Sequence, residues 1–87
     1  MRDKIEFDMN YNYKLEDTIA FMALDGCLAA SNNGLLNKNE LSESLKTLIL
    51  FIKKYNLQDN KTLQRAVEIV IEREDLITWL ENDKHQN

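Results

Sequence analysis

Apolar and polar residues alternate strictly in the segment IEFDMNYNY, at residues 5–13. Successive side chains of a β-strand point to opposite faces, so a period of two is typical of a half-buried strand. A helix would scatter the same apolar side chains around its circumference. We therefore predict a strand, or at least an extended arm, over residues 5–13.

A lone strand leaves its backbone hydrogen-bonding groups without partners, and no second alternating segment is present in the chain. The strand is therefore expected to pair with its twin in a homodimer or to extend the sheet of another protein. The alternative is an extended arm that lies across the helices with a solvated backbone. The residues expected to contact the partner or the second copy are Ile5, Glu6, Phe7, Asp8, Met9 and Tyr11.

The pattern changes at Leu15, where the segment LEDTIAFMALDGCLAAS (residues 15–31) is apolar on nearly all sides. This composition predicts a buried central helix. Asn12 is a candidate N-cap, and the two acidic residues after Leu15 suit the positive end of the helix dipole. Asp25 has to face water at one edge of this helix or find a hydrogen-bond partner. Gly26 is a weak position inside it.

A second helix is predicted over residues 38–55, because its apolar residues recur at intervals of four, three, four and three. These residues are Leu41, Leu45, Leu48, Ile52 and Tyr55. Lys53 and Lys54 lie in its last turn, where the helix dipole favours cations. Asn56 is a reasonable residue to end the helix.

A third helix is predicted to begin between Asp59 and Thr62, both of which are possible caps. Its apolar face comprises Leu63, Ala66, Val67 and Val70. The polar residues 73–75 interrupt the pattern, so residues 76–80 either continue this helix or begin a short fourth one. The fold class expected is a small, mainly α bundle of three or four helices with one N-terminal strand. Residues 1–87 then form a single small domain, with a helical body at 14–82 and a frayed tail at 83–87.

The segment AASNNGLLNKNEL, residues 29–41, resembles the calcium-binding loop of EF-hand proteins when Gly34 is aligned with the glycine of that loop. The resemblance implies oxygen ligands at Ser31, Asn33, Asn37 and Glu40. Ala29 stands where the loop normally has its first aspartate, which leaves one carboxylate for a doubly charged ion. Helix capping explains the same residues: Gly34 or Asn33 ends the first helix, and Asn37 with Glu40 forms a capping box for the second.

Two pairs of acidic residues share a spacing of three: Glu40 and Glu43 in ELSE, and Glu72 and Asp75 in ERED. Together they resemble the ExxE…ExxD pattern of the all-α MazG-like nucleotide pyrophosphohydrolases. That resemblance implies a magnesium ion held by these four carboxylates against a pyrophosphate group. The alternative is a solvated acidic face that pairs with cations such as Arg73.

The predicted order of strand, helix, turn and helix resembles that of ribbon–helix–helix regulators, whose paired strands enter the major groove of DNA. The polar side chains of such a ribbon would include Glu6 and Asp8, which have the wrong sign to approach phosphates. The net charge of −4 and the pI of about 4.9 also disfavour nucleic acid as a partner.

The amino-acid composition narrows the fold class, the possible chemistry of Cys27 and His85, and the compartment in which the protein is expected. The chain has no proline, two glycines and 44% hydrophobic residues, which favours a globular protein with long helices. The single cysteine, Cys27, excludes an intramolecular disulfide and is expected to be a buried small hydrophobe. The single histidine, His85, lies in the polar tail and is expected to be solvated. Neither a membrane-spanning segment nor the apolar core of a signal peptide is apparent, so a cytoplasmic protein is expected.

From these patterns we expect a non-enzymatic protein-binding module: a small acidic regulator, inhibitor or adaptor that uses no metal and no cofactor. The expected partner is another protein, with a homodimer formed through the N-terminal strand. The content of Asn, Lys and Ile is typical of AT-rich bacterial or phage genomes, so a phage or mobile-element origin fits by association. A ribbon–helix–helix-like DNA-binding regulator and a MazG-like magnesium-dependent pyrophosphohydrolase remain the two alternatives.

Overall fold

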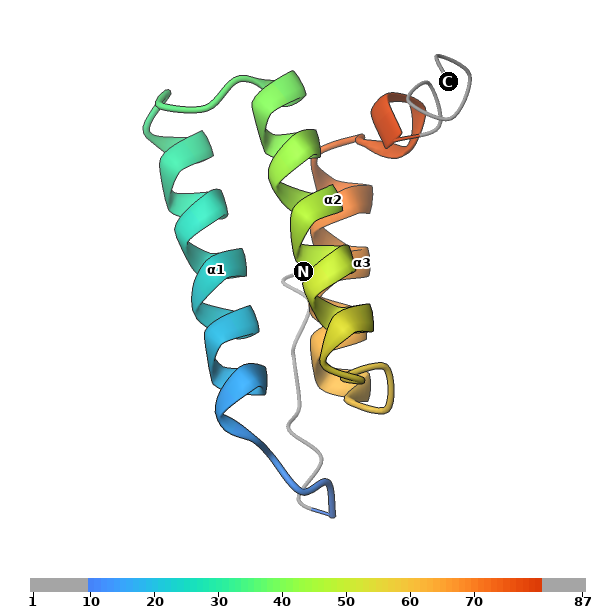
Figure 1. The fold of residues 1–87 in the computed structure, drawn as a ribbon. Helices are drawn as coiled ribbons and strands as arrows, with labels where there is room; N and C mark the ends of the chain where they lie inside the picture. The colour runs from blue at the N-terminus through green and yellow to red at the C-terminus, as the bar shows by residue number, and fades with distance from the viewer. Residues whose placement is uncertain (1–9, 81–87) are drawn as a thin grey trace.

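The computed structural model describes residues 10–80, which form a mainly helical body (Figure 1). Its helices are, in chain order, α1 (Leu15–Asn32), α2 (Lys38–Lys54) and α3 (Lys61–Arg73). A short fourth helical segment follows at residues 77–80. The mainly helical fold class is therefore confirmed.

The strand predicted at residues 5–13 lies largely outside the described residues. Within them no strand is present, and residues 10–13 form a turn, a bend and irregular backbone that leads into α1. The pairing of residues 5–9 with a partner stays a prediction.

The two amphipathic patterns predict the core correctly. Helices α1 and α2 run antiparallel as neighbours, and α2 lies in front of α3 in Figure 1. The predicted face of α3 is buried throughout, and so is the stripe of α2 apart from its last member, Tyr55, which is 38% exposed. The contiguous buried core consists of Ala20, Leu24, Leu41, Leu45, Leu48, Ile52, Leu57, Leu63, Ala66, Val67, Val70 and Leu76.

Helix α1 is not the buried central helix that its composition predicts. Only Asp17, Ala20 and Leu24 of its 18 residues are buried, whereas Leu15 is 71% exposed and Met22 is 67% exposed. The physical reason is that α1 lies at one side of the bundle, where α2 and α3 cover only one of its faces (Figure 1). The sequence of α1 therefore makes it apolar on nearly all sides, but how much of it is buried depends on the positions of α2 and α3.

The N-terminus of α1 also differs from the prediction, because Lys14 rather than Asn12 is the N-cap residue. The side chain of Asp17 accepts a hydrogen bond from the backbone N–H of Lys14 at 2.8 Å, so the third residue of the helix supplies the capping group. Asp17 thus satisfies one of the backbone donors that a helix start leaves unpaired.

All three long helices end in the same way, with a residue of positive φ two positions after the last helical residue. These residues are Gly34 (φ 76°), Asn56 (φ 57°) and Asp75 (φ 54°). In each case the following leucine donates its backbone N–H to the carbonyl five residues earlier, which is the Schellman motif. The ending at Asp75 separates α3 from residues 77–80, so the segment after residue 73 begins a new helix instead of extending α3.

Candidate interaction surface

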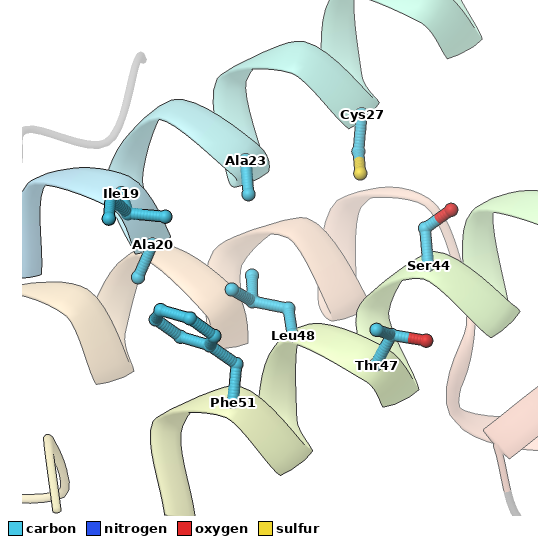
Figure 2. Close-up of a pocket in the computed structure, with 8 residues that line it drawn as sticks. All are labelled: Ile19, Ala20, Ala23, Cys27, Ser44, Thr47, Leu48 and Phe51. Atoms are coloured by element: carbon cyan, nitrogen blue, oxygen red, sulfur yellow. The ribbon is translucent and has the colours of Figure 1, made fainter. Parts of the chain in front are cut away.

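An apolar groove runs between α1 and α2 on the outside of the bundle (Figure 2). It is lined by Ile19, Ala20, Ala23 and Cys27 of α1 and by Ser44, Thr47, Leu48 and Phe51 of α2. Its volume is about 320 Å³, and none of these eight residues is charged. The groove therefore offers an apolar side chain a place to bind.

The groove forms because small and large residues face each other across two antiparallel helices. Ile19, Ala23 and Cys27 recur every four residues, so they share one side of α1. Phe51 forms a wall on α2 across from Ile19 and Ala20, while the short side chain of Ala23 lies across from Leu48 (Figure 2). Buried Ala20 and Leu48 form the floor and belong to the core.

The two hydroxyl groups at the groove bond to their own helix. Ser44 Oγ donates to the carbonyl of Glu40 at 2.9 Å, and Thr47 Oγ1 donates to the carbonyl of Glu43 at 3.1 Å. The Cys27 thiol is half-buried, and its side chain points toward Ser44 (Figure 2). With both hydroxyl protons already donated to the helix backbone, the groove is suited to apolar contact.

The apolar surface continues from the groove along the outside of α1. We use "the α1–α2 face" for this surface, which consists of Leu15, Ile19, Met22, Ala23, Cys27, Ser44, Thr47 and Phe51. Leu15, Met22 and Ile19 are 71%, 67% and 44% exposed. Scattered apolar side chains are ordinary on a protein surface, but a contiguous patch with a hollow is typical of a binding site.

A buried polar cluster lies around Asp17, at the N-terminal end of α1. The Asp17 side chain is fully buried and accepts hydrogen bonds from Asn60 Nδ2 at 2.8 Å and from the Tyr11 hydroxyl at 3.2 Å, in addition to the Lys14 N–H. Asn60 is also fully buried, and its Oδ1 accepts the N–H of Leu63 as the N-cap of α3. This cluster ties the first turns of α1 and α3 together, and we assign it a structural role.

Burial raises the pKa of the Tyr11 hydroxyl above its ordinary value of 10.0, and the neighbouring Asp17 carboxylate adds to the shift. A deprotonated phenol would lose hydration and would stand beside a carboxylate. Of the six residues expected to contact a partner, Tyr11 is the one that the structure describes, and its hydroxyl bonds within its own chain. Ile5, Glu6, Phe7, Asp8 and Met9 lie outside the described residues.

The four carboxylates of the MazG-like pattern have separate surroundings. Glu40 Oε1 accepts the backbone N–H of Asn37, Glu43 lies 3.4 Å from Lys46 Nζ, and Glu72 lies 3.8 Å from Arg65. Asp75 is the positive-φ residue that ends α3. Within residues 10–80 no group of three or more acidic, histidine or cysteine side chains is placed to hold a metal ion.

The segment that resembles a calcium loop is occupied by helix capping. Asn37 Oδ1 accepts the N–H of Glu40 at 2.8 Å, and Glu40 accepts the N–H of Asn37 at 3.0 Å, which is the predicted capping box. The Asn33 amide donates to the carbonyl of Ala29 at 2.8 Å, and Gly34 supplies the left-handed residue. The capping interpretation is therefore confirmed at both helix ends.

Sequence reasoning missed the α1–α2 face because it took the apolar circumference of α1 as a sign of burial. The available signal was the repeat of Ile19, Ala23 and Cys27 on a side of α1 different from that of buried Leu24. One apolar stripe is enough to attach a helix to its own bundle, so a second apolar stripe on α1 is available for contact with another molecule.

Comparison with protein-family models, with curated proteins and with solved structures finds no match to this chain. Among the described residues, none of the helices combines the length and the apolar character that a membrane crossing requires.

Proposed function

We propose that this chain acts by binding protein through the α1–α2 face and that it carries out no catalysis itself. The observation that supports the proposal is the uncharged groove between α1 and α2, together with the exposed apolar side chains beside it. Burying such side chains against a partner is favourable at roughly 25 cal/mol per Å² of apolar surface.

The groove favours a helix or an apolar anchor residue over an extended peptide. Its long axis follows two antiparallel helices, which is the geometry into which an amphipathic helix packs its apolar ridge. Phe51 provides an aromatic wall, and aromatic residues contribute strongly to protein interfaces.

The proposal keeps the biological role expected from the sequence: a small acidic regulator, inhibitor or adaptor in the cytoplasm. The net charge of −4 is mild and the residues that line the groove are uncharged, so the contact surface of the partner need not be basic. The strand predicted at residues 5–13, with Ile5, Phe7 and Met9 on one side, would add a second contact.

A matched pair of variants tests the proposal. Ala23→Glu places a charged side chain in the groove, and Ala23 is exposed, so the bundle is expected to stay folded. Leu50→Glu is the control, because Leu50 is 65% exposed on α2 but lies outside the α1–α2 face. Circular dichroism verifies the helical content of both variants.

The measurement is retention of proteins from the source cell on each immobilised chain, identified by mass spectrometry. A protein that the parent chain and Leu50→Glu retain, and that Ala23→Glu loses at least roughly tenfold, supports the proposal; a tenfold loss corresponds to about 1.4 kcal/mol of binding. Equal retention by all three chains, or no specific retention by any, contradicts it.

A further inference from the structure

We infer that the partner of the α1–α2 face is a second copy of this chain, packed antiparallel across a two-fold axis to form a four-helix arrangement of α1, α2 and their symmetry mates. This inference rests on the proposed function, because it uses the α1–α2 face, extended along α1 by Gly26 and Ala29 and along α2 by Glu40 and Lys54. It is independent of the strand predicted at residues 5–13.

Apolar residues on the outer side of α1 have the spacing of a helix–helix seam. Leu15, Ile19, Met22, Gly26 and Ala29 recur at intervals of four, three, four and three. Such a stripe forms the seam between two packed helices. It lies apart from the side of α1 that buries Ala20 and Leu24 in the core of its own chain. Helix α1 therefore carries one stripe for its own bundle and one for another helix.

Side-chain size decreases along this outer stripe from the N-terminal to the C-terminal half of α1. Leu15, Ile19 and Met22 are large and lie in the first half of α1, whereas Gly26 and Ala29 in the second half are small. A methyl group added at Gly26 would meet no atom within 4 Å, so space remains above this position. In an antiparallel pair, the large half of one copy lies against the small half of the other. A parallel pair would instead place large residues against large and leave voids elsewhere.

The groove-facing side of α2 carries opposite charges at its two ends. Glu40, Ser44, Thr47, Phe51 and Lys54 follow the same four-three spacing on the side of α2 that faces the groove. The stripe is thus acidic at its start and basic at its end. An antiparallel two-fold arrangement places Lys54 of one copy near Glu40 of the other, and it does so at both ends of the interface. Opposite charges at the rim select the orientation and the partner.

The extent of the α1–α2 face can be compared with the area of a standard protein interface. An 18-residue helix is about 27 Å long, and two neighbouring helices are about 20 Å across. These dimensions enclose about 540 Å², or about two thirds of the roughly 800 Å² per partner of a standard interface, which is the size of a weak interface. Its centre is uncharged, so two acidic chains with a net charge of −4 can approach there with the least repulsion. We expect dissociation in the micromolar range, since area alone does not produce tight binding.

Sedimentation velocity and light scattering of the full chain, from low micromolar to millimolar concentration, test the inference. The average mass is expected to rise from 10.2 kDa toward twice that value as concentration increases. Ala23→Glu should shift the midpoint of this rise at least roughly tenfold toward higher concentration, whereas Leu50→Glu should leave it in place.

A charge exchange tests the antiparallel orientation. Lys54→Glu alone should weaken the dimer, because it sets two carboxylates opposite each other at both ends. Adding Glu40→Lys on the same chain should restore association, since each new pair is again of opposite sign. Circular dichroism controls for the capping bond of Glu40 that the second change removes.

The outcomes separate this inference from the proposed function. A mass that stays at 10.2 kDa up to millimolar concentration overturns the inference, and the proposed function then stands or falls with its own capture experiment. A dimer that Leu50→Glu disrupts and Ala23→Glu does not would overturn the inference and contradict the use of the α1–α2 face. A dimer that Lys54→Glu leaves unchanged overturns the antiparallel arrangement.

Discussion

Single residues with unusual backbone or burial decide where the helices of this chain begin and end. Gly34, Asn56 and Asp75 adopt left-handed conformations that return the chain toward the bundle. Leu57 and Leu76, which follow two of them, are fully buried, whereas Leu35 after Gly34 is 75% exposed. The same motif therefore attaches two helix ends to the core and leaves the α1–α2 turn on the surface.

Gly34→Ala is expected to lower the free energy of unfolding by about 1 kcal/mol, because alanine resists a φ of 76°. Nothing lies within 4 Å of the added methyl group, so the effect is conformational. Gly26→Ala is the control: it places the same methyl group inside α1, also in open space, and is expected to add about 0.5–1 kcal/mol. Urea unfolding in dilute solution measures both. Equal effects of the two changes would rule out this account of the turn.

Tyr11 is expected to make stability depend on pH in the alkaline range. Its pKa in the folded chain is raised above 10.0 by burial and by Asp17, so the fold favours the neutral phenol. This contribution is fully present below pH 10.0 and is lost as the pH rises through the pKa of the folded state. Thermal melting at increasing pH should show a steeper loss for the parent than for Tyr11→Phe. The lysines titrate in both chains, so parallel curves would show that Tyr11 does not contribute.

At the scale of elements, the Asp17 cluster holds the start of α1 against the start of α3. These first turns are 43 residues apart in sequence and are joined by the Asn60–Asp17 hydrogen bond. Helix α2 contacts α1 along the antiparallel pair, so α1 is fixed by packing on one side and by buried polar contacts at its N-terminus. Buried polar groups that are fully hydrogen-bonded contribute to a single defined arrangement of helices.

Asp17→Ala is expected to cost about 3 kcal/mol, because it removes the acceptor of three hydrogen bonds and leaves the buried amide of Asn60 without this bond. Asn60→Ala removes the same contact and the α3 cap. The double variant should therefore cost about 1–2 kcal/mol less than the sum of the two single variants. A double-mutant cycle by urea unfolding gives this coupling, and strict additivity would show that the two residues act separately.

At the scale of the whole molecule, the helices within residues 10–80 cover α1 on one side only. Its inner side packs on α2 and α3, and its outer side, with the groove to α2, is exposed among the described residues. The chain thus keeps an uncharged apolar surface in a protein of net charge −4. Acidic residues elsewhere on the surface oppose non-specific association, which agrees with the specific contact proposed for this face.

Local chemistry made most helix boundaries predictable. The four-three spacing of Leu41, Leu45 and Leu48 marks the buried side of α2, and Asn37 with Glu40 marks its start. These signals act over three or four residues, so no knowledge of the fold is needed to interpret them. The N-cap of α1 was missed because the capping group is Asp17, inside the helix and committed to a distant partner, Asn60.

The sequence by itself determined which segments form α1, α2 and α3, where α2 starts, and that α1 ends near Gly34, since capping and periodicity are local. The structure chose Gly34 over Asn33 as the left-handed residue and Asn60 as the cap of α3. Only the tertiary structure decided which side of α1 is covered, because that depends on where α2 and α3 lie. It also decided that Asp17 is buried, that four carboxylates stay apart, and that Ala23 and Phe51 border one groove. When a helix is apolar on every side, its sequence does not show which side will be buried. The packing of the other helices decides which side that is.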